Sequence, residues 1–316
     1  MRIFWTLLLG FCSSLCFAQL NLNQTQFQKF EGFFNFHYDS SNDKIYMEVS
    51  DLEKEFLYIS SLSSGVGSND IGLDRGQLGG ERVVYFKKMG NKLLLIQPNL
   101  EYRALTENAL EKESVKQAFA SSVLFGFPIE TTQKGNYVID LTPFLMQDTH
   151  EVSSRLKQSN QGAYSIDKTK SAVNLDRTRA FPKNIELDIM LTFSGQAKGR
   201  YIRSVTPTPD LVTVAQHHSF VALPELDFEK RAYDPRSGAY AFSYMDYATP
   251  VSSPIVKRFV ARHRLEKKDP NAAVSEAVEP IIYYLDNGTP EPVRSALFEG
   301  GRWWNQAFEA ISYKDA

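Results

Sequence analysis

Alternation between apolar and polar positions is the main pattern in the first part of the chain. Residues 33–38 are mostly aromatic, residues 39–43 are polar, and in residues 44–49 every second side chain is large and apolar. Because successive side chains of a strand point to opposite faces, this pattern predicts a hairpin with one buried face. The bulky residues 56–59 predict a third strand.

Strand patterns return downstream. They predict a hairpin of residues 82–88 and 93–97 around Gly90-Asn91, strands 123–129 and 137–141 around a turn at 134–136, and strands 185–193, 211–221 and 255–265. Residues 60–80 are dense in Ser and Gly, which predicts a surface loop. The loop lacks both the third glycine of a dinucleotide-binding loop and the Gly-Lys-Ser/Thr of a P-loop. Aromatic residues in 227–247 fit a half-buried strand or a platform for a sugar or peptide.

Helical signals are few and short in this region. Residues 108–120 are rich in Ala, Leu, Glu and Lys, which favours a helix. Thr142-Pro143 is typical of an N-cap followed by a first helical position, and predicts a brief helix through Met146. In residues 150–184 we expect loops and one short helix. Together these patterns predict an α+β protein that is predominantly antiparallel β.

The last forty residues have a different pattern. Residues 279–287 form an apolar, aromatic run that ends at Asp-Asn-Gly, as a buried strand would. Thr289 is placed as an N-cap with Pro290 at the first helical position. Apolar residues then recur along one face of a helix: Val293, Ala296, Leu297, Trp304, Phe308 and Ile311. We expect this face to need a partner surface that follows residue 316, and the helix to be loosely held without it.

The first 18 residues predict a signal peptide. Arg2 supplies a positive charge, residues 3–11 are apolar, and Ala18 precedes a cleavage point at Gln19. The apolar run is shorter than the roughly 20 residues of a membrane span. Lipoprotein processing is the rival interpretation, but no small residue precedes Cys12 or Cys16. We therefore predict export to the periplasm, the cell envelope or the extracellular space.

Composition narrows the classes of function. Both cysteines lie in the predicted signal peptide, so the mature chain has no disulfide, thiolate ligand or cysteine nucleophile. A content of 43% hydrophobic and 23% charged residues is typical of a soluble globular protein. The formal net charge of −2 gives no electrostatic reason to expect nucleic acid as a partner.

The sequence predicts no catalytic and no metal-binding residue. A helical zinc site needs two His four positions apart with a Glu beside the first, but Ser154 stands four positions after His150. His217 and His218 are adjacent and would face opposite sides of a strand. We expect these residues, with His37 and His263, to be structural or exposed. The sequence contains no G-x-S-x-G motif, and no cofactor-binding residue is predicted either.

Specific residues of the last segment suggest a family. The stretch Tyr283-Tyr284-Leu285-Asp286, then Pro-x-x-Val-Arg-x-Ala, then Gly-Gly-x-Trp-Trp-Asn-Gln-Ala-Phe-Glu-Ala resembles the opening of a metzincin-type catalytic domain. More narrowly, it resembles a family of large secreted bacterial zinc-dependent metalloproteases. Further stretches carry the same resemblance: Gly72-Leu73-Asp74-Arg75-Gly76, residues 122–128, residues 217–220 before Leu223-Pro224, and residues 262–270. The H-E-x-x-H-x-x-G-x-x-H zinc site of that family is absent from the 316 residues.

The residue patterns and the resemblance together imply a domain order. After the signal peptide at 1–18 come a β-rich segment at 19–98 and a second β-rich segment with short helices at 99–270. A linker at 266–277 precedes the start of a truncated, metzincin-like α/β peptidase domain at 277–316, which supplies its first strand and helix.

Two functions follow as expectations. In the first, the chain is the amino-terminal part of an exported metalloprotease that needs zinc and acts on protein or peptide substrates. This chain alone would bind no zinc and would be inactive. In the second, it is an exported β-rich binding module without catalysis. Substrate preference, oligomeric state and the role of the β-rich region do not follow from the sequence.

Overall fold

The computed structural model describes residues 20–225 and 228–316, so the predicted signal peptide lies outside the described residues. Contacts group the chain into two units. The large unit consists of the residues up to Asn99 together with Phe119–Pro224, and the small unit consists of Leu100–Ala118 together with Glu225–Ala316. The small unit is built from two separate stretches of chain. Residues 102–103 of its first stretch pair with residues 245–246 of its second, about 140 positions downstream.

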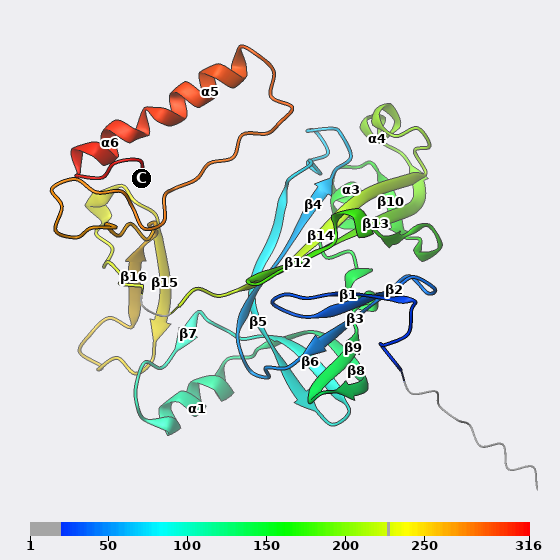
Figure 1. The fold of residues 1–316 in the computed structure, drawn as a ribbon, viewed down its shortest axis with the longest axis horizontal. Coiled ribbons are helices and arrows are strands. Elements are labelled where there is room, and N and C mark those ends of the chain that lie inside the picture. Colours follow the sequence, from blue (N-terminus) through cyan, green and yellow to red (C-terminus); the bar gives the residue numbers. More distant parts are fainter. Residues whose placement is uncertain (1–19, 226–227) are drawn as a thin grey trace, which may run out of the picture. The chain divides into compact units, whose positions relative to one another are not determined.

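The large unit is one antiparallel sheet that curls until it nearly closes (Figure 1). In sheet order its strands are β1 (Phe27–Phe30), β2 (Phe36–Asp39), β3 (Lys44–Val49), β9 (Asn136–Asp140), β8 (Ser122–Gln133), β6 (Lys92–Gln97), β5 (Leu78–Met89), β4 (Phe56–Ser64), β14 (Leu211–Ala222), β13 (Asn184–Ala197) and β10 (Gly162–Ile166). The short strands β11 (Ala172–Val173) and β12 (Arg179–Phe181) also pair with β13.

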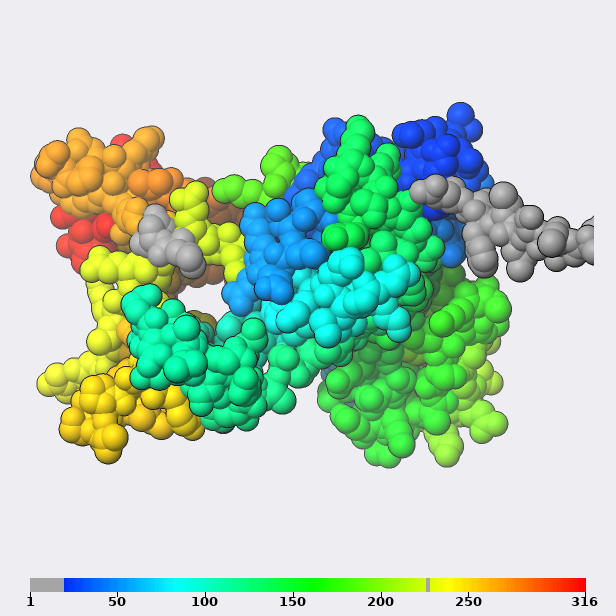
Figure 2. Space-filling view, turned by 90° about the horizontal axis from the view of Figure 1, so that it is seen from below, coloured from blue at the N-terminus to red at the C-terminus, as the bar shows by residue number. Residues whose placement is uncertain are grey.

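Short helices complete the large unit. They are α2 (Thr142–Leu145), α3 (Val152–Gln158) and α4 (Arg200–Val205), with the 3-10 turns η1 (Lys168–Lys170) and η2 (Leu175–Arg177). In the space-filling view, blue, cyan and green segments of this unit lie directly against one another, although they are far apart in sequence (Figure 2).

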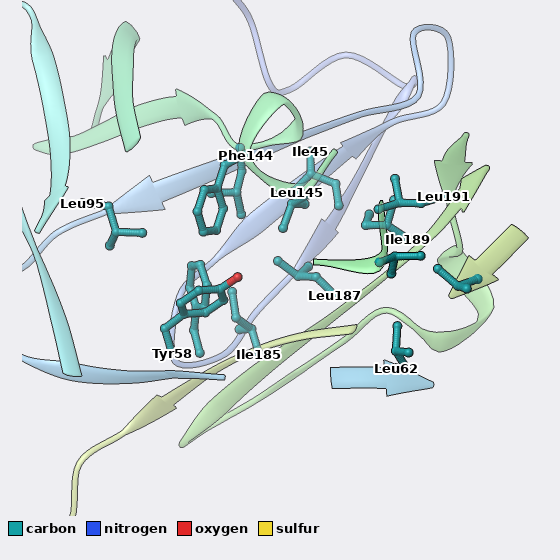
Figure 3. Close-up of a cluster of buried hydrophobic side chains, with 14 of the residues drawn as sticks. Ile45, Tyr58, Leu62, Leu95, Phe144, Leu145, Ile185, Leu187, Ile189 and Leu191 are labelled. Atoms are coloured by element: carbon teal, nitrogen blue, oxygen red, sulfur yellow. The ribbon is translucent and has the colours of Figure 1, made fainter. Parts of the chain in front are cut away.

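One hydrophobic core fills the inside of the curled sheet. Alternate residues of β13 point into it, from Ile185 to Phe193, and each is fully buried. Helix α2 adds Phe144 and Leu145, which lie near Ile45 and Tyr58 (Figure 3). Burying a side chain of this size contributes about 1.5–3 kcal/mol. This core therefore holds the described part of the large unit together.

The strand predictions for this unit are confirmed. The hairpin of β2 and β3 places Phe36 opposite Met47, and β5 pairs with β6 around the turn at Gly90. Strands β4, β8, β9, β13 and β14 lie where the sequence predicted them, and α1 (Ala109–Ala118) is the expected helix, in the small unit. The predominantly β character is therefore correct.

The predicted surface loop at residues 60–80 needs correction. Strand β4 continues to Ser64 and β5 begins at Leu78, so the connection is shorter than predicted. Ile71 and Leu73 within it are buried in the core. The backbone oxygen of Ile71 accepts a hydrogen bond from Arg155 Nε at 2.5 Å. The prediction failed because it weighed the Ser and Gly residues of this segment and not the apolar residues between them, which pack into the core.

Two further predictions are wrong in detail. Thr142 is the first residue of α2 rather than its N-cap, and its Oγ1 instead accepts a hydrogen bond from the backbone N–H of Ile45 at 2.9 Å. Residues 150–184 contain strands β10, β11 and β12 in addition to the expected helix α3. These strands are short and border one long strand, β13, so their own sequences carry little periodicity.

The small unit contains a three-stranded sheet in the order β16 (Val256–Val260), β15 (Ala241–Asp246), β7 (Tyr102–Arg103), and the turn η3 (Pro235–Ser237). Tyr244 of β15 is buried, as the half-buried strand requires, whereas Tyr240 is exposed. In the segment expected as a linker, Lys267 pairs with Ala277 and Ser275 pairs with Tyr313.

The predicted strand at 279–287 does not form. Residues 281–286 have no assigned strand in the structure, and Tyr283 and Tyr284 are 85% and 91% exposed. A strand needs a neighbour for its backbone hydrogen bonds, and no strand of the described residues pairs with this one.

The last helix begins later than predicted. It starts at Val293 as α5 (Val293–Arg302) and continues as α6 (Trp304–Ala310), with Pro292 rather than Thr289 at the N-cap position. Pro290 and Pro292 explain the shift, because each disfavours the helical conformation in the residue before it. Neither helix buries a residue. Among the described residues, no helix combines the length and the apolar character that crossing a membrane requires.

Candidate functional site

His217 and His218 occupy opposite faces of β14, as their adjacency predicts. His218 points into the core and is fully buried. Its Nδ1 lies 3.0 Å from Tyr58 Oη, and its Nε2 lies 3.2 Å from the backbone oxygen of Leu145. Burial lowers the pKa of His218 to about 3, and burial also raises the pKa of Tyr58 to about 12. Both groups are therefore neutral at ordinary pH, and each has a partner.

On the other face, His217 lies between two carboxylates of the neighbouring strand β13. Its Nε2 is 2.7 Å from Glu186 Oε2 and its Nδ1 is 3.0 Å from Asp188 Oδ2. Burial alone would lower the pKa of His217, but the hydrogen bonds to Asp188 and Glu186 raise it to about 9. Burial alone would raise the pKa of each carboxyl, but hydrogen bonds from His217 and its neighbours hold both below their ordinary values. The cluster is a protonated imidazole held by two carboxylates.

The two carboxylates have further partners. Asn174 Nδ2 donates to Asp188 Oδ1 at 2.9 Å, and Ser63 Oγ donates to Asp188 Oδ2. Ser219 Oγ donates to Glu186 Oε2 at 2.5 Å. A protonated imidazole with both nitrogens donating has no lone pair for a metal ion or a proton. Through these contacts the cluster ties β4, β13 and β14 together.

The remaining histidines are separate from one another. His37 Nε2 contacts Glu48 Oε1 at 2.8 Å, His150 Nε2 contacts Gln77 Oε1 at 3.3 Å, and His263 is exposed in the small unit. Burial lowers the pKa of His150. Over residues 20–225 and 228–316, no three His, Cys, Asp or Glu side chains are grouped as metal ligands would be.

A pocket in the large unit is the best candidate for a functional site. It has a volume of about 680 Å³, within the range of about 300–1,000 Å³ usual for small-molecule sites. Apolar and aromatic side chains line one part of it: Tyr58, Leu124, Phe125, Pro143, Phe144, Met146 and Ile166. Charged and polar side chains line the rest: Arg82, Gln147, Asp148, Thr149, Glu151 and Lys168.

The elements around the pocket explain how these residues meet. Arg82 lies directly opposite Tyr58 in the pairing of β4 with β5. Phe144 packs against Tyr58 and Phe125, with ring centroids 5.4 and 5.8 Å away. Helix α2 thus forms an aromatic wall, and the chain after it supplies the polar residues from Gln147 to Glu151.

Some charged side chains of the pocket have hydrogen-bond partners among the described residues and others have none. Asp148 accepts hydrogen bonds from the backbone N–H groups of Val152 and Ser153 at 2.7 and 2.9 Å, which satisfies the start of α3. In contrast, the side chains of Arg82, Lys168 and Glu151 make no hydrogen bond or ion pair within the described ranges. These unpaired groups are available to a ligand.

Sequence reasoning missed this pocket, although one signal was present. Arg82 has the same parity in β5 as the buried Val84 and Phe86, so an arginine stands on the core-facing side of a predicted strand. The other lining residues come from four separate segments, and only the tertiary structure brings them together.

Two known protein families match parts of the chain. Residues 76–268 match the family described as domain of unknown function (DUF5117), and residues 24–65 match domain of unknown function (DUF5118). The first match covers more than half of the 316 residues. The chain belongs to the DUF5117 family. No curated protein and no solved structure matches it.

The two matched regions do not fold separately. Strand β4, which lies in the DUF5118 match, pairs with β5 and β14 of the DUF5117 match. Strand β3 likewise pairs with β9. The pocket takes Tyr58 from the first region and its other lining residues from the second. The two family regions therefore share one sheet, one core and one candidate site.

Proposed function

We propose that this chain is the amino-terminal region of an exported zinc-dependent metalloprotease whose peptidase domain continues beyond residue 316. Support comes from the motifs at residues 283–286 and 300–310, which resemble the start of a metzincin-like catalytic domain. The β-rich large unit would position substrate, shield the cleft or help the peptidase domain to fold.

The residues that the structure describes do not fit a zinc site. Catalytic zinc needs three convergent protein ligands and an open position for water. The sequence has no H-E-x-x-H, and His217 already uses both ring nitrogens in contacts to Glu186 and Asp188. In this proposal a segment after residue 316 supplies the metal ligands and the general base, and the 316 residues supply none of them.

The observation that carries the proposal is the exposed apolar face of α5 and α6. The large side chains on these helices and directly after them are 45–67% exposed: Val293, Leu297, Phe298, Trp303, Trp304 and Ile311. Burying each would contribute about 1.5–3 kcal/mol, but only against a partner surface. Several large apolar side chains exposed on one short helical segment are typical of an interaction site. The rest of a peptidase domain is the partner that the sequence motifs indicate.

The second candidate is an exported binding module without catalysis. The pocket lined by Arg82 and Phe125 favours it, because that site lies wholly within the large unit and needs no added domain. The first candidate predicts that a chain extended beyond residue 316 hydrolyses peptide bonds. The second predicts no hydrolysis, with or without such an extension.

The test begins with the DNA downstream of the codon for Ala316, read in all frames for H-E-x-x-H. The present chain and a chain extended through that motif are then compared by metal analysis and by peptide hydrolysis with and without a chelator. We expect stoichiometric zinc and chelator-sensitive hydrolysis only in the extended chain. Stoichiometric zinc in the present chain, or no motif downstream, would rule out the peptidase proposal and leave the binding module.

A further inference from the structure

Arg82 is a cation on the inner side of a strand, and nothing in the described chain neutralises it. It shares a face of β5 with the buried Val84 and Phe86, and its side chain is only partly exposed. The guanidinium extends over Gly80, where an added Cβ would come within 2.7 Å of Nη1. The absence of a side chain at residue 80 thus leaves room for the guanidinium beside the pocket.

A guanidinium at such a site selects a planar anion. Its fork of N–H donors matches the two oxygens of a carboxylate, and hydrogen bonds between charged groups are stronger where water is partly excluded. Lys168 provides a second unpaired cation on the rim, while Glu151 provides an unpaired carboxylate and Asp148 a paired one. Because the four charges sum to zero, the site favours a ligand with one negative charge over a dianion such as phosphate.

The remaining lining residues of the pocket indicate which chemical group is attached to that anion. Leu124, Phe125 and Met146 present apolar surface next to the charged groups. The Gln147 carboxamide makes no hydrogen bond in the described residues and can pair with an amide of a ligand. A carboxylate, a neighbouring apolar group and adjacent amides occur together at the end of a polypeptide.

We propose that this pocket binds the free carboxyl terminus of a peptide whose last side chain is apolar. Arg82, assisted by Lys168, holds the terminal carboxylate. Phe125 and its apolar neighbours hold the last side chain, and Gln147 contacts the preceding amide. Peptide binding here does not require the zinc peptidase proposed above, because every residue involved lies in the large unit.

Isothermal titration calorimetry on the full 316-residue chain tests the proposal. The probe is an acetylated hexapeptide that ends in leucine with a free carboxylate, compared with its carboxyl-terminal amide and with a version that ends in serine. We expect saturable binding of the free acid, about tenfold or greater weakening on amidation, and a smaller loss for the serine ending. Sodium dodecanoate is the fourth probe, since it offers a carboxylate and an apolar chain without amides.

Variants assign the effect to the pocket. Arg82→Met should weaken binding of the free acid about tenfold or more and should remove the difference between acid and amide. Lys87→Met is the matched control, because residue 87 lies on the same strand with opposite parity and lines no part of the pocket. Circular dichroism checks that both variants remain folded. Absence of saturable binding at millimolar peptide, equal binding by Arg82→Met, or binding of dodecanoate but not of the peptide would each overturn the proposal.

Discussion

Strand β14 and the helix pair α5–α6 both carry large apolar and aromatic side chains but bury them to very different extents. In β14, Val212, Val214 and Phe220 are at most 1% exposed, whereas Trp303 and Trp304 are 65% and 67% exposed. The strand pairs on both sides, with β4 and β13, and one of its faces meets the core. The helices bury none of their residues. An apolar stripe therefore stabilises a fold only where another surface meets it, and hydrophobicity alone does not ensure burial.

Amide hydrogen exchange should show the largest difference between the two regions. Amides of β14 should exchange only through opening events close to global unfolding, while amides from Val293 to Phe308 should exchange through local fraying. We expect protection factors that differ by about a thousandfold or more. Mass spectrometry of exchanged and digested protein gives this comparison. Strong protection from Val293 to Phe308 would show that the helices have docked and would remove the main support for a missing partner.

Truncation of one phenylalanine in each region should give the next largest effect. Phe220→Ala removes a fully buried ring that contacts Phe56 and Tyr58, and should lower the free energy of unfolding by about 3–5 kcal/mol. Phe298→Ala, at a ring 45% exposed, should change it by no more than about 0.5 kcal/mol. Urea unfolding followed by circular dichroism measures both. Similar losses for the two variants would mean that α5 is packed in solution.

The charged cluster around His217 should make the large unit sensitive to pH. The folded pKa of His217, about 9, lies above its ordinary value of 6.5, so its contribution is complete below pH 6.5 and is lost as the pH rises towards 9. The loss should be about 3 kcal/mol over that window. The lowered pKa values of Glu186 and Asp188 act in the other direction, and their contribution is lost as the pH falls below the ordinary carboxyl range.

The variant His217→Gln should be less stable near pH 6 and should lose most of the decline between pH 6.5 and 9. Arg236→Gln in the small unit is the control, because its pair with Asp234 is largely exposed and should leave the profile unchanged. Urea unfolding at a series of pH values checks both variants. A wild-type profile that is flat across this window would contradict the protonated state of His217.

The sequence predicted strands best where burial alternates along a single segment. In β3 and β13, alternation alone placed the strand and the face that is buried. It failed at residues 279–287, where an apolar run has the composition of a strand but no neighbour to pair with. It also failed at Ile71 and Leu73, which lie in a Gly-rich segment but pack into the core. In each failure the outcome depended on a distant surface that local composition does not describe.

The candidate site was hidden for the same reason. Its aromatic wall and its cations come from β4, β5, β8, α2 and η1, and no short motif joins them. The partners of His217 could not be predicted from the sequence either, because Glu186 and Asp188 lie about 30 positions earlier on another strand.

The sequence by itself determined the predominance of strands, most strand positions, the opposite orientations of His217 and His218, and the amphipathic character of the last helix. These properties follow from side-chain spacing along one segment and from backbone geometry. Only the tertiary structure decided that the two family regions share one sheet, that residues 100–118 join strands far downstream, and that Arg82 stands unpaired beside an aromatic wall. Those outcomes depend on contacts between segments that are far apart in the sequence. Burial, strand pairing and charge neutralisation arise from such contacts, so no single stretch of chain determines them.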